Sequence, residues 1–193
     1  MRRIFSNVAG FILLTLFTTL VFANDMTVMK QEAADITQVF VKQLGEALQK
    51  EMQAGGPVAA VKVCSELAPQ ITGQISRDKG WKVTRVGTRV RNPMLGLPDS
   101  WEQKVLAQFQ ERSGKGETFD KMAVAEIVEE PGGNYFRFMK AIGVQPQCLA
   151  CHGDPKEMKD EVKALLKERY PHDQATGYKA GDLRGAVSIK RPL

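Results

Sequence analysis

The stretch that decides the fold is MAVAEIVEEPGGNYFRFMKAI, residues 122–142. Two segments with the composition of β-strands, near residues 122–129 and 135–142, lie on either side of Pro131 and Gly132-Gly133. A proline followed by paired glycines is typical of the tight turn that joins two antiparallel strands. The sequence therefore predicts a β-hairpin here.

The N-terminal half predicts helices. Apolar residues recur at helical spacing along residues 25–53, and Gly55-Gly56 ends that segment. A second helix begins at Pro57 and carries Cys64 on its apolar face. Pro69 lacks the N–H that would bond the carbonyl four residues earlier, so we expect this second helix to kink or stop there. Two further helices are expected, one after Asp99-Ser100 and one over residues 156–169.

Residues 81–91 change to the pattern of a strand, because their valines and threonines have high β propensity. A last strand is expected over residues 183–190. Helices that come first and antiparallel strands that follow indicate an α+β domain. In this domain, the N-terminal helices pack on an antiparallel sheet.

The first residues have the pattern of an export signal. Arg2-Arg3 precede an apolar stretch over residues 8–22, and Val21-Phe22-Ala23 resembles a cleavage site. We expect a signal peptide over residues 1–23, cleaved after Ala23, and a periplasmic protein. The alternative is an uncleaved membrane anchor, but the apolar stretch is shorter than the roughly 20 residues that a span prefers.

Cleavage would leave residues 24–193, which suffice for one domain with its own core. It removes two arginines and no acid, so the formal net charge of +5 falls to +3. No basic run is long enough to suggest a nucleic-acid partner, and no membrane span is expected after cleavage. The charge therefore says little about function.

Cys148-Leu149-Ala150-Cys151-His152 is the sequence feature with the most specific chemistry. Two thiols at this spacing can add across the two vinyl groups of one haem, and the adjacent imidazole then binds the iron. A single C-x-x-C-H run implies one covalent haem c. Three alternatives are an isolated disulfide, a thiol–disulfide oxidoreductase, and a zinc site that also uses Cys64. The zinc site would require the adjacent Cys151 and His152 to reach one tetrahedral metal.

The second axial ligand of the iron has several candidates. Cys64 faces inward and has no second cysteine to pair with once Cys148 and Cys151 bind haem. His172 lies in a polar loop and is expected to face water. Of the methionines, Met94 in the loop after the strand is the best placed. The other methionine candidates are Met52, Met122, Met139 and Met158. The spacing of these residues alone does not decide whether the second ligand is a cysteine, a histidine or a methionine.

Several stretches resemble one family along nearly the whole of residues 24–193. They are Val63-Cys64-Ser65-Glu66-Leu67-Ala68-Pro69, Arg89-Val90-Arg91-Asn92-Pro93, Pro98-Asp99-Ser100-Trp101-Glu102, the C-x-x-C-H run with Gly153, and Gly181-Asp182-Leu183-Arg184-Gly185-Ala186-Val187-Ser188. The chain is similar to exported single-haem domains with a PAS-like fold, which occur alone or fused to signalling modules as sensory input.

This resemblance implies a PAS-like fold and iron ligation by His152 on one side and Cys64 on the other. The sensor-kinase members carry a transmembrane helix and a kinase after the haem domain. We expect the present chain to pass any signal to an unknown periplasmic partner protein.

Three arginines share one side of the predicted strand: Arg85, Arg89 and Arg91. Guanidinium groups suit bidentate pairing with the propionates of haem, and Arg89 and Arg91 are our candidates for this role. The alternative is an ordinary solvated strand face.

These features support two hypotheses about function. The first is a periplasmic monohaem c protein that senses redox state or a small diatomic gas through a haem ligated by His and Cys. The second is a simple periplasmic electron-transfer cytochrome c. The sequence contains no carboxylate pair, nucleophile elbow or phosphate-binding loop, so we expect no enzyme activity.

Overall fold

The computed structural model describes residues 9–193, with side chains described from Asp25 onward. The expected signal peptide over residues 1–23 therefore lies outside the described side chains, and its first eight residues lie outside the described backbone. Among the described residues, no helix is both long enough and apolar enough to cross a membrane.

The first described element is a long helix, α1 (Ala9–Lys62). Gly56 interrupts it with φ 68° and ψ −161°, so α1 is two helices joined at a kink. The two predicted helices and the break between them are confirmed. Pro57 then lies in the first turn of the second helix, where its missing N–H costs nothing.

The second helix was expected to kink or stop at Pro69; it does not stop there, and the irregularity lies in the turn just before this residue. The chain passes through one π-helical turn, η1 (Val63–Leu67), in which the Ala68 N–H donates to the Val63 carbonyl, and continues as α2 (Ala68–Lys79). Pro69 lies in the first turn of α2, and the wider π turn accommodates it. The π turn contains Cys64.

Four strands form one antiparallel sheet in the order β1-β4-β3-β2. Their bounds are β1 (Lys82–Gly87), β2 (Ala123–Glu130), β3 (Gly133–Gly143) and β4 (Leu183–Pro192). The predicted hairpin is confirmed as β2 and β3, which close at the Glu130–Gly133 pair. Gly133 has φ 120°, a conformation that side-chain-bearing residues rarely adopt. The predicted α+β class is confirmed as well.

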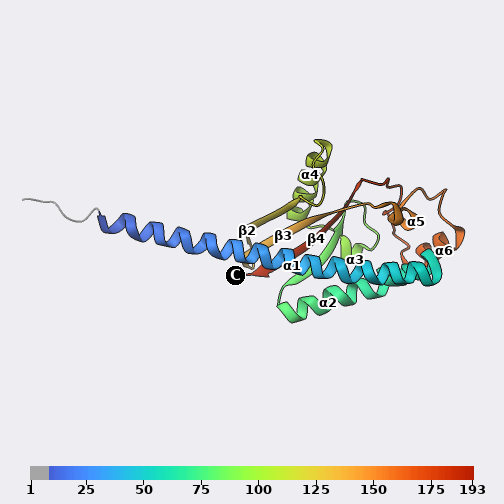
Figure 1. Ribbon diagram of the computed structural model, residues 1–193, viewed down its shortest axis with the longest axis horizontal. Coiled ribbons are helices and arrows are strands. Elements are labelled where there is room, and N and C mark those ends of the chain that lie inside the picture. Colours follow the sequence, from blue (N-terminus) through green and yellow to red (C-terminus); the bar gives the residue numbers. More distant parts are fainter. Residues whose placement is uncertain (1–8) are drawn as a thin grey trace, which may run out of the picture.

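Helices cover both faces of the sheet (Figure 1). On one face, Phe40 of α1 packs with Phe136, Phe138 and other residues of the largest core cluster. On the other face, α4 (Ser100–Gly114) contributes Phe109 to a cluster that contains Met139. Successive residues of β3 thus alternate between the two cores. Fully burying a side chain of this size contributes roughly 1.5–3 kcal/mol relative to leaving it exposed.

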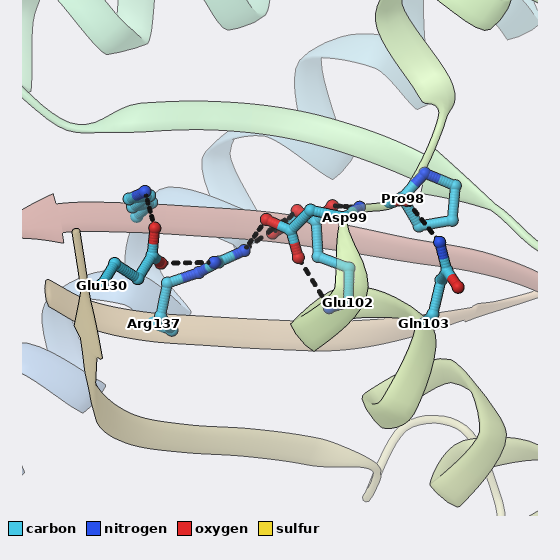
Figure 2. A network of polar contacts seen from close by, with 8 residues as sticks. Pro98, Asp99, Glu102, Gln103, Glu130 and Arg137 are labelled. Carbon is cyan, nitrogen blue, oxygen red and sulfur yellow. Dashed lines mark hydrogen bonds and ion pairs between the residues drawn. The ribbon is translucent and has the colours of Figure 1, made fainter. Parts of the chain in front are cut away.

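A buried arginine fastens α4 to the sheet. Arg137 of β3 is 2% exposed, with Nη2 at 2.7 Å from Asp99 and Nη1 at 2.8 Å from Glu130 (Figure 2). Its guanidinium also lies over the ring of Trp101, at 4.5 Å from the centroid. Asp99 and Glu102 also form a reciprocal capping box at the start of α4. The Pro98–Glu102 stretch therefore has a structural role.

The predicted strand over residues 81–91 ends early, at Gly87. Its partner β4 begins at Leu183, and Gly87 pairs with Gly185, so residues after Gly87 soon have no strand to pair with. Arg89 and Arg91 consequently leave the strand face that carries Arg85.

Four short elements complete the fold. They are α3 (Pro93–Gly96), η2 (Pro146–Cys148), α5 (Leu149–His152) and α6 (Asp160–Arg169). The helix expected from residue 156 thus starts at Asp160. Both α5 and α6 lie at the end of α1 farthest from its N-terminus (Figure 1).

Candidate functional site

A cavity of about 1780 Å³ lies between the helices and the sheet. It is larger than the roughly 300–1000 Å³ of most small-molecule pockets. Cys64, Cys148, Cys151 and His152 all line it. The π turn and the η2–α5 segment, far apart in sequence, thus bring three thiols and one imidazole to a single cavity. The sequence predicted this combination.

The imidazole of His152 is oriented by the backbone. Its Nδ1 lies 2.7 Å from the Ala175 carbonyl oxygen, which can only accept, so Nδ1 carries the proton and donates it. Nε2 is then left as an acceptor with a free lone pair. Burial, and then the charges of Arg91, Arg184 and Arg85, lower the pKa of His152 to about 2. The ring is therefore neutral, as a metal ligand must be.

Arg91 holds the loop that orients His152. Its Nε donates to Asp173 at 3.0 Å, and its Nη2 donates to the carbonyls of Cys151 at 2.5 Å and Ala175 at 3.2 Å. The Asp173 carboxylate also accepts from the Ala175 N–H at 2.7 Å. Arg91 lines the cavity, but these bonds direct most of its guanidinium into the protein. It thus connects the C-x-x-C-H segment to the loop after α6.

The thiols lie in a partly apolar environment. Burial raises the pKa of the Cys151 thiol, the charge of Arg91 opposes this shift, and Cys64 and Cys148 add to it. Cys64 and Cys148 are therefore both within electrostatic reach of Cys151. Cys151 packs against a cluster that includes Val61, Val162, Leu166 and Tyr170, which limits the access of water to this end of the cavity. All three cysteines are free thiols.

Two further arginines, Arg85 and Arg184, line the same cavity. Neither makes an ion pair with a carboxylate among the described residues. Burial, together with the charges of Arg91 and Arg85, lowers the pKa of Arg184. Arg184 was not among the candidates from sequence, although it lies in the Gly181–Ser188 stretch of the resemblance. Only the pairing of β4 with β1 shows that Arg184 lies on the side of the sheet that faces the cavity.

The family described as Tll0287-like matches residues 22–192. The chain belongs to the Tll0287-like family. The crystal structure of the cyanobacterial heme-protein Tll0287 is similar in fold, with a TM-score of 0.63 and 24% sequence identity over 84% of this chain and 96% of that chain. No match is found among curated proteins. This likeness bears out the α+β architecture of the Tll0287-like chain.

Three of the candidates from sequence lie away from the cavity of this Tll0287-like protein. Arg89 is exposed, stacks on the Tyr178 ring at 3.8 Å from its centroid and donates to the Thr176 carbonyl at 2.5 Å. Met94 is 89% exposed, so it does not have the inward position that a ligand requires. His172 is exposed, as predicted. Both Met94 and His172 border a separate cavity of about 220 Å³.

The other methionine candidates differ in position. Met52 lines the large cavity, whereas Met122 and Met139 are buried between α4 and the sheet, and Met158 packs against α6. The described side chains of the Tll0287-like chain contain no group of three or more His, Cys, Asp and Glu residues that could hold a metal ion. A zinc site built from protein ligands alone would require such a group.

Proposed function

We propose that this protein binds one haem c covalently in the large cavity. Cys148 and Cys151 would hold it through two thioether bonds, and His152 would bind the iron. One observation carries the proposal: the His152 Nδ1–H donates to the Ala175 carbonyl, so Nε2 keeps a free lone pair beside the two thiols of the C-x-x-C-H run. The structural neighbour Tll0287 is a heme-protein, which supports the proposal.

We propose Cys64 as the second axial ligand. It lines the same cavity, lies within electrostatic reach of Cys151, and belongs to a π-helical turn, a feature that is frequent at functional sites. Met94 and His172 do not line the cavity, and Met52 is the one competing candidate that does. Thiolate donation stabilises ferric iron and lowers the reduction potential relative to ligation by His and Met. The PAS-like character of the domain belongs to the same proposal.

When bound, haem supplies a one-electron couple and an axial position that a small molecule can occupy. The residues of the chain set the conditions for both. The Ala175 carbonyl, held by Arg91, fixes the ring of His152, and the apolar cluster that packs against Cys151 limits the access of water to that end of the cavity. Cys64 would hold ferric iron more tightly than ferrous iron, because the larger metal charge favours a thiolate, so this ligand would be labile. This lability favours a sensor of redox state or of a diatomic gas.

A simple electron carrier is the second candidate, and one observation favours it. Leu95 lines the cavity and is 54% exposed, and its neighbours Met94 and Leu97 are 89% and 67% exposed. A redox partner could dock on this apolar surface beside the cofactor, because the core of a protein–protein interface is more apolar than its rim. In either case, we propose export to the periplasm after cleavage behind Ala23, an unknown redox or signalling partner protein, and no enzyme activity.

Covalent attachment is tested by mass spectrometry of the exported protein from a host that matures c-type cytochromes. We expect a mass equal to residues 24–193 plus one haem, and haem that resists extraction with acid–acetone. The variant Cys148→Ala/Cys151→Ala should bind haem that acid–acetone extracts completely. A wild-type mass without haem, or haem that acid–acetone removes, would contradict the assignment.

A further inference from the structure

Arg85 and Arg184 lie on the two paired strands that form one wall of the cavity. Arg85 is in β1, opposite Val187, and Arg184 is in β4, next to the Gly87–Gly185 pair. Both are partly buried, and both line the cavity that contains His152. Their charges also act on His152, where they contribute to its lowered pKa. Two cations thus lie on one wall of the candidate haem site.

These two partly buried cations lack the counterions that Arg91 and Arg137, the buried arginines of the described chain, have. Arg137 pairs with three carboxylates and Arg91 pairs with Asp173. Arg184 instead donates from Nη1 to the Arg89 carbonyl at 3.1 Å, and Arg85 lies over the ring of Phe40 at 5.8 Å. Burial of a charge without a counterion is costly, so this arrangement indicates an anionic ligand.

The backbone makes room for one of these guanidinium groups. A Cβ at position 87 would lie 2.7 Å from Nη1 of Arg184 and 2.8 Å from the Arg89 carbonyl oxygen. Only a glycine therefore permits Arg184 to lie where it does. The guanidinium of Arg184 also lies over the ring of Tyr178, at 5.4 Å from its centroid, and interacts with the hydroxyl of that residue. These contacts and the bond to the Arg89 carbonyl use only some of its five N–H donors, so others remain for a ligand in the cavity.

We propose that Arg85 and Arg184 are the carboxylate-binding pair of this site and that they hold the two propionates of the haem. The inference rests on the proposed function. The charges match, since two guanidinium groups meet two carboxylates, and each guanidinium can form a bidentate bond. Arg89 is outside the cavity and Arg91 is bound to Asp173 and two carbonyls, so neither of the residues favoured by sequence has this role.

The test measures how much the carboxylates of haem contribute to its binding. In the full mature chain carrying Cys148→Ala/Cys151→Ala, haem can bind only without thioether bonds. We would titrate this parent with haem and with haem dimethyl ester, which has no carboxylates, and take the ratio of the two dissociation constants. Charge-assisted hydrogen bonds predict that the parent binds free haem at least about tenfold more tightly than the ester.

Arg85→Gln and Arg184→Gln, each added to the parent, should lose most of this preference, because their remaining contacts are the same for both forms. Two control variants should keep it: Arg89→Gln, outside the cavity, and Arg77→Gln, which removes one exposed charge on α2. Arg85→Lys and Arg184→Lys keep the charge and should retain part of the preference, which covers the case in which a glutamine variant does not fold.

The outcomes distinguish a failure of the carboxylate-binding pair from a failure of the proposed haem site. Equal ratios in the parent and in both glutamine variants, or a loss of preference in Arg89→Gln instead, would overturn the carboxylate-binding pair and leave the haem site standing. If the parent binds neither haem nor its ester, the proposed function fails, and the inference fails with it.

Discussion

Replacing Asp173 by alanine tests the connection that orients His152. The Asp173 carboxylate accepts from Arg91 Nε at 3.0 Å and from the Ala175 N–H at 2.7 Å. The two side chains of the ion pair are only 8% and 12% exposed, for Arg91 and Asp173 respectively. The substitution therefore leaves a buried guanidinium without its counterion and a backbone N–H without its acceptor.

The expected loss of stability follows from these two defects. Breaking a buried ion pair by removing one partner costs about 3–5 kcal/mol. An unsatisfied buried N–H adds about 1–3 kcal/mol. Arg91 keeps its bonds to the carbonyls of Cys151 and Ala175, which offsets part of the loss. We expect Asp173→Ala to lower the free energy of unfolding by about 3–6 kcal/mol. Asp173→Asn, which can still accept from Ala175, should cost less.

Urea unfolding of the full mature chain, followed by far-ultraviolet circular dichroism, measures this difference. The matched control is Asp160→Ala, because Asp160 forms an ion pair with Lys163 at 2.7 Å but its side chain is 95% exposed. This control should unfold at the wild-type urea concentration. If Asp173→Ala behaves like the control, the bonds of Arg91 neither stabilise the loop nor orient His152 through it.

Two further predictions concern the iron ligand and the buried arginine. Cys64→Ser should raise the reduction potential of the haem-loaded protein and abolish the ferric thiolate charge-transfer bands. The control variant His172→Ala should leave the optical spectra unchanged. A wild-type spectrum in Cys64→Ser would show that the thiol only packs in the core, and it would favour the electron carrier. Arg137→Met should lower the free energy of unfolding by about 3–5 kcal/mol at neutral pH, because it leaves the buried carboxylate of Glu102 without its cation and removes one of the two cations beside Glu130. Its pH profile gives a second readout. The pKa of Glu130 is lowered by its bonds to Lys190 and then Arg137, and that of Asp99 is lowered, against its own burial, by the Glu102 N–H and Arg137. A carboxyl group whose pKa is lower in the folded state stabilises the fold at pH values above its ordinary pKa, which is 4.5 for Glu130 and 3.8 for Asp99. This stabilisation is lost as the pH falls through the pKa of the folded state. Wild type should therefore lose stability below about pH 5 more steeply than Arg137→Met, and parallel pH profiles would show that Arg137 does not set these pKa values.

Local features of the sequence were sufficient to predict much of the fold. Turn chemistry at Pro131 and Gly132-Gly133 places the hairpin, because φ near 120° at Gly133 is available to glycine at little cost. The apolar spacing of residues 25–53 and the glycines after them place α1 and its kink. These signals act over a few residues, so they are readable in the sequence.

The C-x-x-C-H run was readable for the same reason, since its three groups lie within five residues of one another. Cys64 was also placed correctly toward the interior, because helical periodicity determines the face on which a residue lies. The π turn around it was not predicted. It is made by the bond from the Ala68 N–H to the Val63 carbonyl five residues earlier, which the spacing of apolar residues does not reveal.

The roles of the arginines were decided only by the tertiary structure. Sequence alternation placed Arg85, Arg89 and Arg91 on one strand face, but β4 begins at Leu183 and leaves residues after Gly87 without a partner. The chain leaves the strand after Gly87, so Arg89 lies at the surface and Arg91 binds Asp173. Arg184 reaches the cavity because β4 pairs with β1, a contact between segments nearly a hundred residues apart. Period and spacing report only on neighbours along the chain, whereas the partner of each charge depends on which strands pair and where the pairing ends.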